Sequence, residues 1–438
     1  MTWYSHVDFL VISMKQSILS APTKVIRQLS MIVVMMIVIP SFNFYLSNIL
    51  LVWGYRSLVV LIYGALLLLM IHGLYIGSKY HLIRRSAIII SVVLALMGVI
   101  SYMIYGDSIG ERLIRPDVHI LYSELLYLFL FALPSLLITS AVRDWDLVVN
   151  KLIKISPFIV AMAIYSWYLV GFRTWGDDSM NYMTLSYHVL TAGCVCLAVS
   201  FTGFKPVYWI ATLFFLFIMI GSGCRGALVC VLLFVILLLV RRVTLHPHSK
   251  SSRFIKIACV VLIVSSPFLY MKVFTNITNM FDKIGISSRV IEMLEDNEFL
   301  SSNSRDNIRT AIMKGVDDNP FGYGLYGDRY VTIKYYQEGS EYAHNVFYEF
   351  LADFGVFLGP LFLLLIFYFC YKCFREYKET NICVALLFLI PDGLLKLFFS
   401  NSYLTDSVFF IFIGFLLSLN YKKVLKGYEN NCNSSDRL

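Results

Sequence analysis

Long apolar runs recur along almost the whole chain and are separated by short polar stretches. A run of about twenty apolar residues is long enough to form a helix that crosses a lipid bilayer. The pattern predicts about twelve membrane spans, at residues 30–48, 57–77, 86–105, 118–141, 153–172, 183–203, 206–221, 225–241, 255–272, 345–371, 380–399 and 405–421. The spans 206–221 and 225–241 are short, and we expect them to form a tight hairpin.

The composition supports the same fold class. Hydrophobic residues make up 58% of the chain, and its mean hydropathy of +0.73 is outside the range of a soluble globular domain. Backbone amides in a bilayer need partners within the protein, which a helix provides. The apolar runs are continuous rather than alternating, which argues against a transmembrane barrel. We therefore expect an all-α, polytopic membrane protein.

One hydrophilic segment, residues 272–344, interrupts the pattern between the ninth and tenth spans. Within it, residues 301–315 carry apolar side chains at helical spacing and predict a short amphipathic helix, with Ser304 as its N-cap and Gly315 as its end. The following Asn-Pro-Phe-Gly-Tyr-Gly, at residues 319–324, predicts a turn that serves as scaffold. No other polar segment between spans is large enough to form structure outside the membrane.

Basic residues predict the orientation of the chain. With the N-terminus inside, the inner loops and tails carry most of the lysines and arginines, as the positive-inside rule requires. The predicted organisation is nine membrane helices in residues 1–271, an outer loop with short amphipathic helices at 272–344, three membrane helices in 345–421 and a cytoplasmic tail at 422–438. The first span is expected to be a retained anchor, because the small-residue pattern of a cleaved signal is missing.

Several functional classes find no support in the sequence. The nine cysteines are scattered and lie mostly inside spans, and Cys370 and Cys373, three residues apart, lie at a span end without ligand partners, so we expect the cysteines to be small packing residues. The net charge of +8 suits an anionic membrane surface and requires no nucleic acid. A Walker loop and an HExxH motif are missing, the glycine spacing at residues 322–327 follows no predicted strand, and the predicted outer segments contain no spaced DxD motif. We therefore expect no metal and no cofactor.

Arg225 is the first candidate site residue. It lies in Gly-Ser-Gly-Cys-Arg-Gly-Ala, residues 221–227, at the outer mouth of the predicted hairpin. An arginine at this depth often only reaches toward lipid headgroups. The flanking glycines, however, carry no side-chain bulk, so we expect a large ligand to approach here. Because a guanidinium matches phosphate oxygens in a planar fork, the pattern predicts a phosphate-binding residue.

Two arginines of the outer loop are further candidates. Arg305 opens the predicted helix, where a helix start favours anions, and Arg289 lies upstream in Ser-Ser-Arg, residues 287–289. The alternative is a solvated surface helix in which Asp306 pairs with Arg305 or Arg309. We expect Arg305 rather than Arg309 to contact an anionic substrate, because only Arg305 lies in the first turn.

His344 ends the outer loop and is followed by Asn345 at the start of the next span. Histidine titrates near neutral pH, so His344 is a candidate general base or a hydrogen-bonding group for a hydroxyl. Asn345 is expected to hold the imidazole or to cap the helix. The alternative for His344 is a helix-terminal residue without a task. His188 is predicted to be a packed core residue, and Asp392 with Lys396 is predicted to be a structural pair.

Taken in order, these segments resemble the O-antigen ligase and polymerase superfamily of bacterial envelope glycan assembly. The resemblance rests on the motifs at residues 221–227, 304–305, 319–324 and 344–345, and on Phe-Gly-Val-Phe-Leu-Gly at residues 354–359. It implies a metal-independent, inverting transfer of a glycan from undecaprenyl pyrophosphate at the periplasmic face of the inner membrane. It further implies that Arg225 and Arg305 grip the pyrophosphate and that His344 assists the acceptor hydroxyl.

Two branches of this superfamily compete. Ligases transfer the finished chain to lipid A-core, and Wzy-type polymerases join lipid-linked repeat units of O-antigen, capsule or exopolysaccharide. The ligase pattern of His-Asn, nine residues, Gly, two residues and then Gly, Thr or Tyr holds as far as Gly355, but Leu358 occupies the last position. Residues 181–187, Asn-Tyr-Met-Thr-Leu-Ser-Tyr, also resemble the polymerases, so we favour a polymerase, with a chain-length regulator as a candidate partner.

A flippase or transporter of lipid-linked sugars is an alternative of a different class. Transporters place charged residues within their spans and often consist of repeated halves. Here the charged residues within spans are few, with Asp392 and Lys396 as the main exceptions, and the polar residues concentrate in one outer loop. This asymmetry favours an enzyme.

Overall fold

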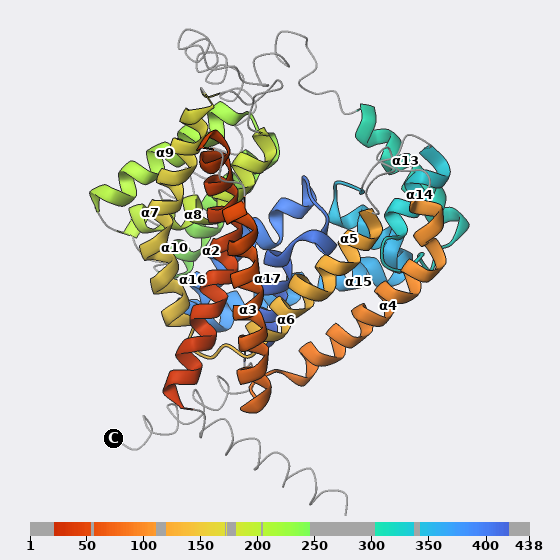
Figure 1. Cartoon of the computed structure of the whole chain (residues 1–438), viewed down its shortest axis with the longest axis horizontal. Coiled ribbons are helices and arrows are strands. Elements are labelled where there is room, and N and C mark those ends of the chain that lie inside the picture. Colours follow the sequence, from red (N-terminus) through yellow and green to blue (C-terminus); the bar gives the residue numbers. More distant parts are fainter. Residues whose placement is uncertain are drawn as a thin grey trace, which may run out of the picture.

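The computed structural model describes residues 22–53, 57–110, 120–170, 172, 181–202, 205–245, 303–336 and 342–419. Within these ranges every regular element is a helix, so the all-α prediction is confirmed (Figure 1). The α-helices are α2 (Thr23–Trp53), α3 (Ser57–Lys79), α4 (Arg85–Gly110), α5 (Ile120–Tyr127), α6 (Leu133–Ser140), α7 (Trp145–Leu169), α8 (Tyr182–Thr202), α9 (Pro206–Ser222), α10 (Arg225–Leu245), α13 (Asn303–Asp318), α14 (Gly327–Tyr336), α15 (Val346–Tyr377), α16 (Asn381–Gly393) and α17 (Ser407–Ser418).

Nine stretches of helix in the described residues are long and apolar enough to cross a bilayer. Two shorter apolar helices, α9 and α17, coincide with the predicted spans 206–221 and 405–421. The predicted span 255–272 lies outside the described residues, so the total of twelve stays a prediction. The chain is a multi-pass membrane protein, and the periplasmic position of the loop also stays a prediction.

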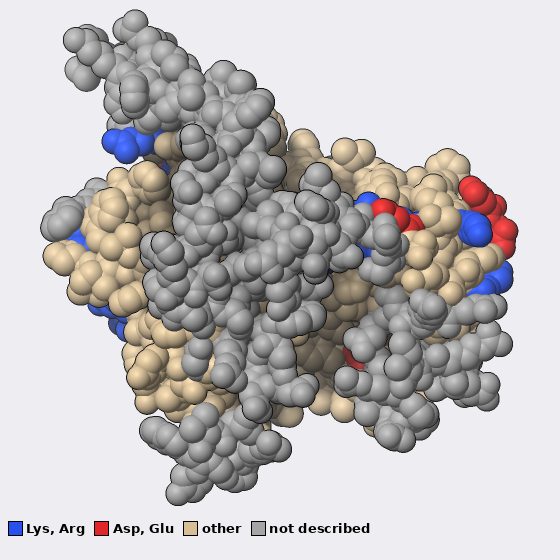
Figure 2. Space-filling view, turned by 90° about the horizontal axis from the view of Figure 1, so that it is seen from above, with Lys and Arg blue, Asp and Glu red and all other residues tan. Residues whose placement is uncertain are grey.

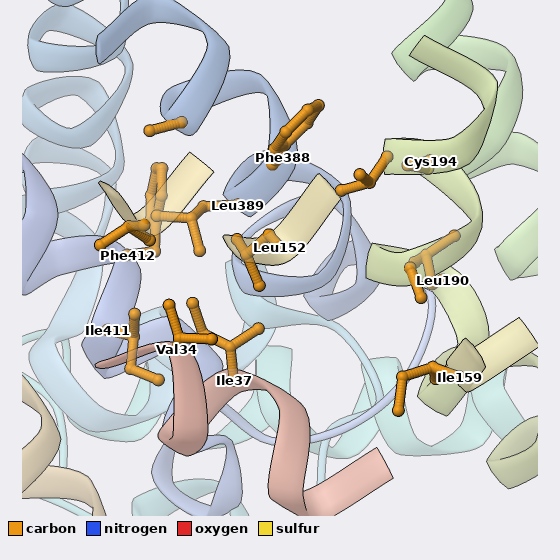
Figure 3. Packing of buried hydrophobic residues seen from close by; sticks show 14 of the residues in the cluster. Val34, Ile37, Leu152, Ile159, Leu190, Cys194, Phe388, Leu389, Ile411 and Phe412 are labelled. Carbon is orange, nitrogen blue, oxygen red and sulfur yellow. The ribbon is translucent and has the colours of Figure 1, made fainter. Parts of the chain in front are cut away.

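A core of apolar side chains joins helices from both halves of the chain. Figure 3 shows Val34 of α2, Leu152 of α7, Leu190 of α8, Phe388 of α16 and Phe412 of α17 around one interior. All five are at most 3% exposed. Because side chains packed at this density fix the position of each helix, α8 and the C-terminal helices form one body.

The predicted span 118–141 is not one regular helix. α5 ends at Tyr127, a π-helix follows at Leu128–Ala132, and α6 begins with Pro134 in its first turn. Single π-turns within helices commonly occur at functional sites, because they change the direction of the side chains. Here the Tyr127 hydroxyl accepts the backbone N–H of Ser407 at 3.1 Å. The irregular segment therefore ties α5 to the start of α17.

α15 is broken at Gly355, where φ is 75° and ψ is −178°. On either side of the break, the N–H of Val356 donates to the carbonyl of Pro320, and the N–H of Gly324 donates to the carbonyl of Asp353, both at 2.9 Å. A Cβ on Gly355 would lie 2.2 Å from the Pro320 oxygen. Only glycine satisfies this conformation and this close approach. The turn at residues 319–324 is thus joined to α15 backbone to backbone.

The first loop helix differs from its prediction. α13 begins at Asn303, so the predicted N-cap Ser304 lies inside the helix, and α13 continues past Gly315 to Asp318. A Cβ on Gly315 would lie 2.4 Å from Cγ1 of Val331 in α14. Gly315 therefore allows α13 and α14 to approach each other and does not end the helix, because tertiary packing outweighs the weak helix propensity of glycine.

The second loop helix, α14, occupies a stretch for which the glycines predict turns. Its Val331 packs with Ile308 and Ile312 of α13 and with Leu351 of α15 in a small apolar cluster of their own. This cluster docks the two loop helices on α15. Seen from above, the visible acidic side chains lie on the side where Figure 1 places α13 and α14 (Figure 2).

Candidate functional site

His344 lies at the junction between the loop helices and α15, in a conformation that the flanking residues impose. Its φ is 55°, in the left-handed region that few residues other than glycine adopt. On one side the N–H of Ala343 donates to Oδ2 of Asp328 at 2.9 Å. On the other side Asn345 begins α15. The ring of Tyr342 lies 4.0 Å from the imidazole, centroid to centroid, and the backbone therefore holds the imidazole at one place.

Asn345 has the capping role that the sequence predicts. Its side-chain oxygen accepts the N–H of Phe347 at 2.9 Å, which satisfies a donor at the start of α15. Its side-chain nitrogen donates to the carbonyl of Phe398 at 2.8 Å. Asn345 thus links the first residue of α15 to the segment after α16, and its two hydrogen bonds make it a structural residue of the site.

The surroundings of His344 lower the pKa of its imidazole to about 4. Burial is the main cause, the positive charge of Arg305 adds to it, and the carboxylate of Asp328 opposes both. The imidazole is therefore neutral at pH 7 and has a free lone pair to accept a proton. Among the described residues, its buried Nδ1 has no hydrogen-bond partner.

Arg305 stands in the first turn of α13, half-buried, and its charge reaches two side chains of the site. It acts on the imidazole of His344 and also on the phenol of Tyr187 in α8. In the described part of the chain no carboxylate lies within salt-bridge distance of Arg305, whereas Arg309 pairs with Asp306 at 3.1 Å. The preference for Arg305 over Arg309 as a substrate contact stays a prediction.

Arg225 begins α10 directly after the hairpin turn. Gly223 ends α9 with a φ of 73°. The space beside the other glycines is filled: a Cβ on Gly221 would lie 2.4 Å from Trp167, and one on Gly226 would lie 2.3 Å from the Tyr187 hydroxyl. The expectation that these glycines leave room for a ligand is therefore wrong, because aromatic side chains pack onto them.

Tyr187 connects the predicted residues. Its hydroxyl touches Gly226, next to Arg225, and it lies within the electrostatic range of Arg305, which in turn acts on His344. Tyr187 thus contacts the start of α10, and the charge of Arg305 at the start of α13 acts on both Tyr187 and His344. Arg289 lies outside the described residues.

A buried ion cluster that the sequence does not predict supports the site. We call Arg329 with its surrounding carboxylates the Arg329 cluster; the carboxylates belong to Glu124, Asp328, Glu349 and Asp353. Arg329 lies 2.7 Å from Asp328, 2.8 Å from Glu124 and 3.5 Å from Glu349. Burial lowers the pKa of Arg329, but the carboxylates raise it well above its ordinary value. The guanidinium therefore stays charged.

The Arg329 cluster joins the loop to the membrane helices. Ser402 donates to Glu349, and the Tyr403 hydroxyl donates to Asp353, whose other oxygen accepts the N–H of Gly327. Two carboxylates of α15 are thus buried within a predicted span. No sequence signal marked Arg329, because an arginine in a polar loop resembles any solvated residue. Through Asp328, the cluster also fixes the backbone next to His344.

A cavity of about 390 Å³ lies next to the site. Tyr187 and Tyr342 belong to its wall, and His188, Asp392, Lys396 and Asp406 line it as well. Lys396 lies 2.5 Å from Asp392 and 2.6 Å from Asp406. The predicted structural pair therefore exists, but it has a third member and an open side. His188 stacks on Phe44, as expected of a packed residue, and also faces this cavity.

The part of the chain that the structure describes contains no group of three His, Cys, Asp or Glu side chains placed to hold a metal ion. The site as described offers cations, a neutral imidazole and, beside them, a polar cavity. Cations can stabilise a leaving diphosphate, and a neutral imidazole can accept the proton of an attacking hydroxyl.

The comparisons with known proteins agree with this chemistry. No curated protein matches the chain. Residues 210–363 match the family model described as O-antigen ligase, Wzy_C. The matched segment begins in α9, ends in α15 and includes Arg225, Arg305 and His344. Members of this family act on lipid-linked oligosaccharides. Over residues 210–363 the chain is therefore similar to the O-antigen ligase family.

Proposed function

We propose that this protein polymerises oligosaccharide repeat units carried on undecaprenyl pyrophosphate, by a glycosyl transfer that requires no metal. The observation that supports it most is that a half-buried, neutral His344, whose Nδ1 has no hydrogen-bond partner among the described residues, lies within reach of the charge of Arg305, which also acts on Tyr187 beside the start of α10. The site thus combines a cation, the Arg305 guanidinium, with a neutral imidazole that can accept a proton. The family match supports the general reaction, a transfer of the O-antigen ligase or polymerase type.

In the proposed reaction a sugar hydroxyl of one lipid-linked unit attacks the anomeric carbon of another. The bond from that carbon to the phosphate oxygen breaks as the new carbon–oxygen bond forms. The leaving group is undecaprenyl pyrophosphate, and the hydroxyl proton goes to His344. Arg225 and Arg305 stabilise the charge that develops on the diphosphate, and Asn345 holds the backbone beside His344. Arg289 is a third candidate for the diphosphate. Attack opposite the leaving group inverts the anomeric centre.

The low pKa of His344 fits this order of events. In the empty site, burial and the charge of Arg305 keep the imidazole neutral. A bound diphosphate brings negative charge next to Arg305, which offsets that charge and raises the pKa of His344. The imidazole thus becomes a better base when the donor is in place. In this proposal, diphosphate binding and proton transfer are coupled through Arg305, whose charge acts on His344.

Two observations favour a polymerase over a ligase. Leu358, where the ligase pattern has Gly, Thr or Tyr, is 49% exposed on α15. The polymerase-like segment at residues 181–187 lies at the site, since Asn181, Thr184 and Tyr187 line the cavity beside His344. The bias of basic residues supports an inner-membrane protein with cytoplasmic termini and a periplasmic site. A chain-length regulator is the partner that a polymerase of this kind would take.

The first test is deletion of the gene in its own strain, with the surface glycan resolved on a gel. A polymerase predicts single repeat units attached to the core. Unmodified core, with long glycan retained on the carrier, indicates a ligase instead. Complete loss of external glycan indicates a flippase, and an unchanged glycan would refute all three.

The second test is complementation of that strain with site variants. Arg225→Ala, Arg305→Ala and His344→Ala should each abolish polymer formation while the protein stays in the membrane. The matched control is Arg309→Ala, which removes an arginine of the same helix as Arg305 but from an exposed pair with Asp306. If all three site variants complement as well as the control does, the proposed mechanism is wrong.

A further inference from the structure

The cavity beside His344 has the size and the lining of a small-molecule site. Its volume of about 390 Å³ falls within the range of about 300–1,000 Å³ that ligand sites occupy. Hydroxyl, amide and carboxylate groups share its wall with aromatic rings. The polar residues on the wall come from five different parts of the chain: Ser41, Tyr127, Asn181, Thr184, Tyr187, His188, Tyr342, Asp392, Lys396, Ser400, Asn401, Thr405, Asp406 and Ser407.

The charge of this cavity differs from that of the arginine site. Two carboxylates, Asp392 and Asp406, contact one ammonium, Lys396, at 2.5 and 2.6 Å. We call these three residues the Lys396 cluster. When all three side chains are ionised, the net charge of the cluster is one negative charge. This charge repels a diphosphate and attracts hydrogen-bond donors. A hydroxyl-rich ligand suits this wall, and an anionic one does not.

One carboxylate of the Lys396 cluster has room for further donors. An ionised carboxylate offers about four acceptor positions. Asp406 accepts from Lys396, from Asn401 at 3.0 Å and from the N–H groups of Val408 and Phe409 at 2.9 and 3.4 Å, so its positions are taken. Asp392 accepts only from Lys396 and from Thr191 at 3.1 Å among the described residues, and it therefore keeps acceptor capacity toward a ligand in the cavity.

Two tyrosines of the wall connect the cavity to the reacting groups. Tyr342 lines the cavity, and its ring centroid lies 4.0 Å from that of His344. Tyr187 also lines the cavity, and its hydroxyl contacts Gly226 next to Arg225. A ligand in the cavity thus borders the base on one side and the start of α10 on the other.

We infer that this cavity is the acceptor subsite, and that it binds an uncharged, hydroxyl-bearing sugar of the acceptor unit. The inference rests on the proposed function and adds to it the residues that select the acceptor. The sugar donates a hydroxyl hydrogen to Asp392, and its hydroxyl nearest Tyr342 is the one that His344 deprotonates. The negative charge of the cluster disfavours acidic sugars such as uronates at this position.

The test fills the cavity without touching the ions or the arginines. Thr184 lies one turn before Tyr187 and His188 on the same face of α8. Thr184→Phe should lower polymer formation by roughly tenfold or more, because the phenyl ring takes the space of the sugar. Ser41→Phe, from the α2 wall, should act in the same way if Thr184→Phe disturbs folding. Val207→Phe is the matched control, because Val207 lies on α9 outside the cavity wall and is 61% exposed.

Donor binding separates this inference from the proposed function. The probe is geranylgeranyl pyrophosphate, a polyprenyl pyrophosphate without a sugar, bound to purified protein in nanodiscs. Thr184→Phe and Ser41→Phe should bind the probe like the unmodified protein, whereas Arg225→Ala and Arg305→Ala should lose it. If the arginine variants bind normally, the proposed diphosphate site fails.

The acceptor subsite itself fails on either of two results. Normal polymer from both filling variants would mean that no sugar occupies the cavity. Loss of probe binding in the filling variants, to the same extent as in Arg305→Ala, would mean that the cavity belongs to the donor. Loss of polymer with intact probe binding and an unchanged thermal midpoint is the result that supports it.

Discussion

The Arg329 cluster and the Lys396 cluster contain similar groups but have different surroundings. Both are buried and both combine acids with one base. Arg329 is surrounded by protein: carboxylates, Ser402 and the ring of Tyr326 occupy its donors and its face. Lys396 lies on the wall of a cavity of about 390 Å³. The difference teaches that burial of charge alone does not mark a binding site, whereas burial of charge beside an open volume does.

The two clusters also act on the site in different ways. The Arg329 cluster acts on His344 through Asp328, which accepts the N–H of Ala343 and whose charge raises the pKa of the imidazole. We therefore call it a brace, meaning a structural cluster that fixes the position of His344. The Lys396 cluster and Tyr342 line the same cavity, and Tyr342 packs against His344. A ligand in the cavity would therefore connect the cluster with the imidazole. Substitutions should separate these roles.

The largest effect should come from Arg329→Met. It leaves the carboxylates of Glu124, Asp328, Glu349 and Asp353 buried without their cation. Removing one partner of a buried ion pair costs about 3–5 kcal/mol of folding free energy. We expect a lower thermal midpoint in detergent, less protein in the membrane and no polymer. Arg309→Met, in an exposed pair, should cost less than about 1 kcal/mol. Equal stability of the two variants would show that the cluster is not a brace.

A second effect, somewhat smaller, should come from Lys396→Met. The two carboxylates of Asp392 and Asp406 then face each other without a cation, and stability falls. The triple variant Asp392→Asn, Lys396→Met, Asp406→Asn removes all three charges, so most of the stability should return. Polymer formation should not return, because amides are weaker acceptors of sugar hydroxyls than carboxylates. A triple variant with normal polymer would place the Lys396 cluster in the same structural class as the Arg329 cluster.

The smallest effect concerns the pH dependence that these surroundings give to His344. The neutral imidazole is the active form, and its pKa in the empty site is about 4. The acid limb of kcat/KM, which reports the free enzyme, should therefore lie near pH 4 rather than at the ordinary value of about 6.5. The limb of kcat should lie at higher pH, because bound diphosphate raises the pKa.

Arg305→Gln provides the control for the pH profile. Removing the positive charge should move the kcat/KM limb of the residual activity upward, toward the ordinary value for histidine, because Arg305 is one cause of the lowered pKa. Arg309→Gln should leave the limb in place. A limb near 6.5 in the unmodified protein, or no shift in Arg305→Gln, would remove His344 from its proposed role.

Much of the site follows from local sequence. Arg225, Arg305 and His344 stay predictions from the sequence, whereas Asn345 is the cap that the sequence predicts. The role of the glycines was harder to predict, because a glycine that admits a ligand and one that admits an aromatic ring look alike in sequence. Gly226 contacts Tyr187, and Gly315 contacts Val331, only because of tertiary packing.

The sequence by itself determined the all-helical membrane character and the places of most of the described spans, and it supplied the residues that we propose for contacts with phosphate and hydroxyl groups. These features depend on apolar run length and residue type, which are local properties. Only the tertiary structure decided that Arg329 is buried, that Gly355 breaks α15, and that Asp406 joins Asp392 and Lys396 beside a cavity. The physical reason is that burial, close backbone approach and empty volume are properties of several segments together, and no single stretch of sequence contains them.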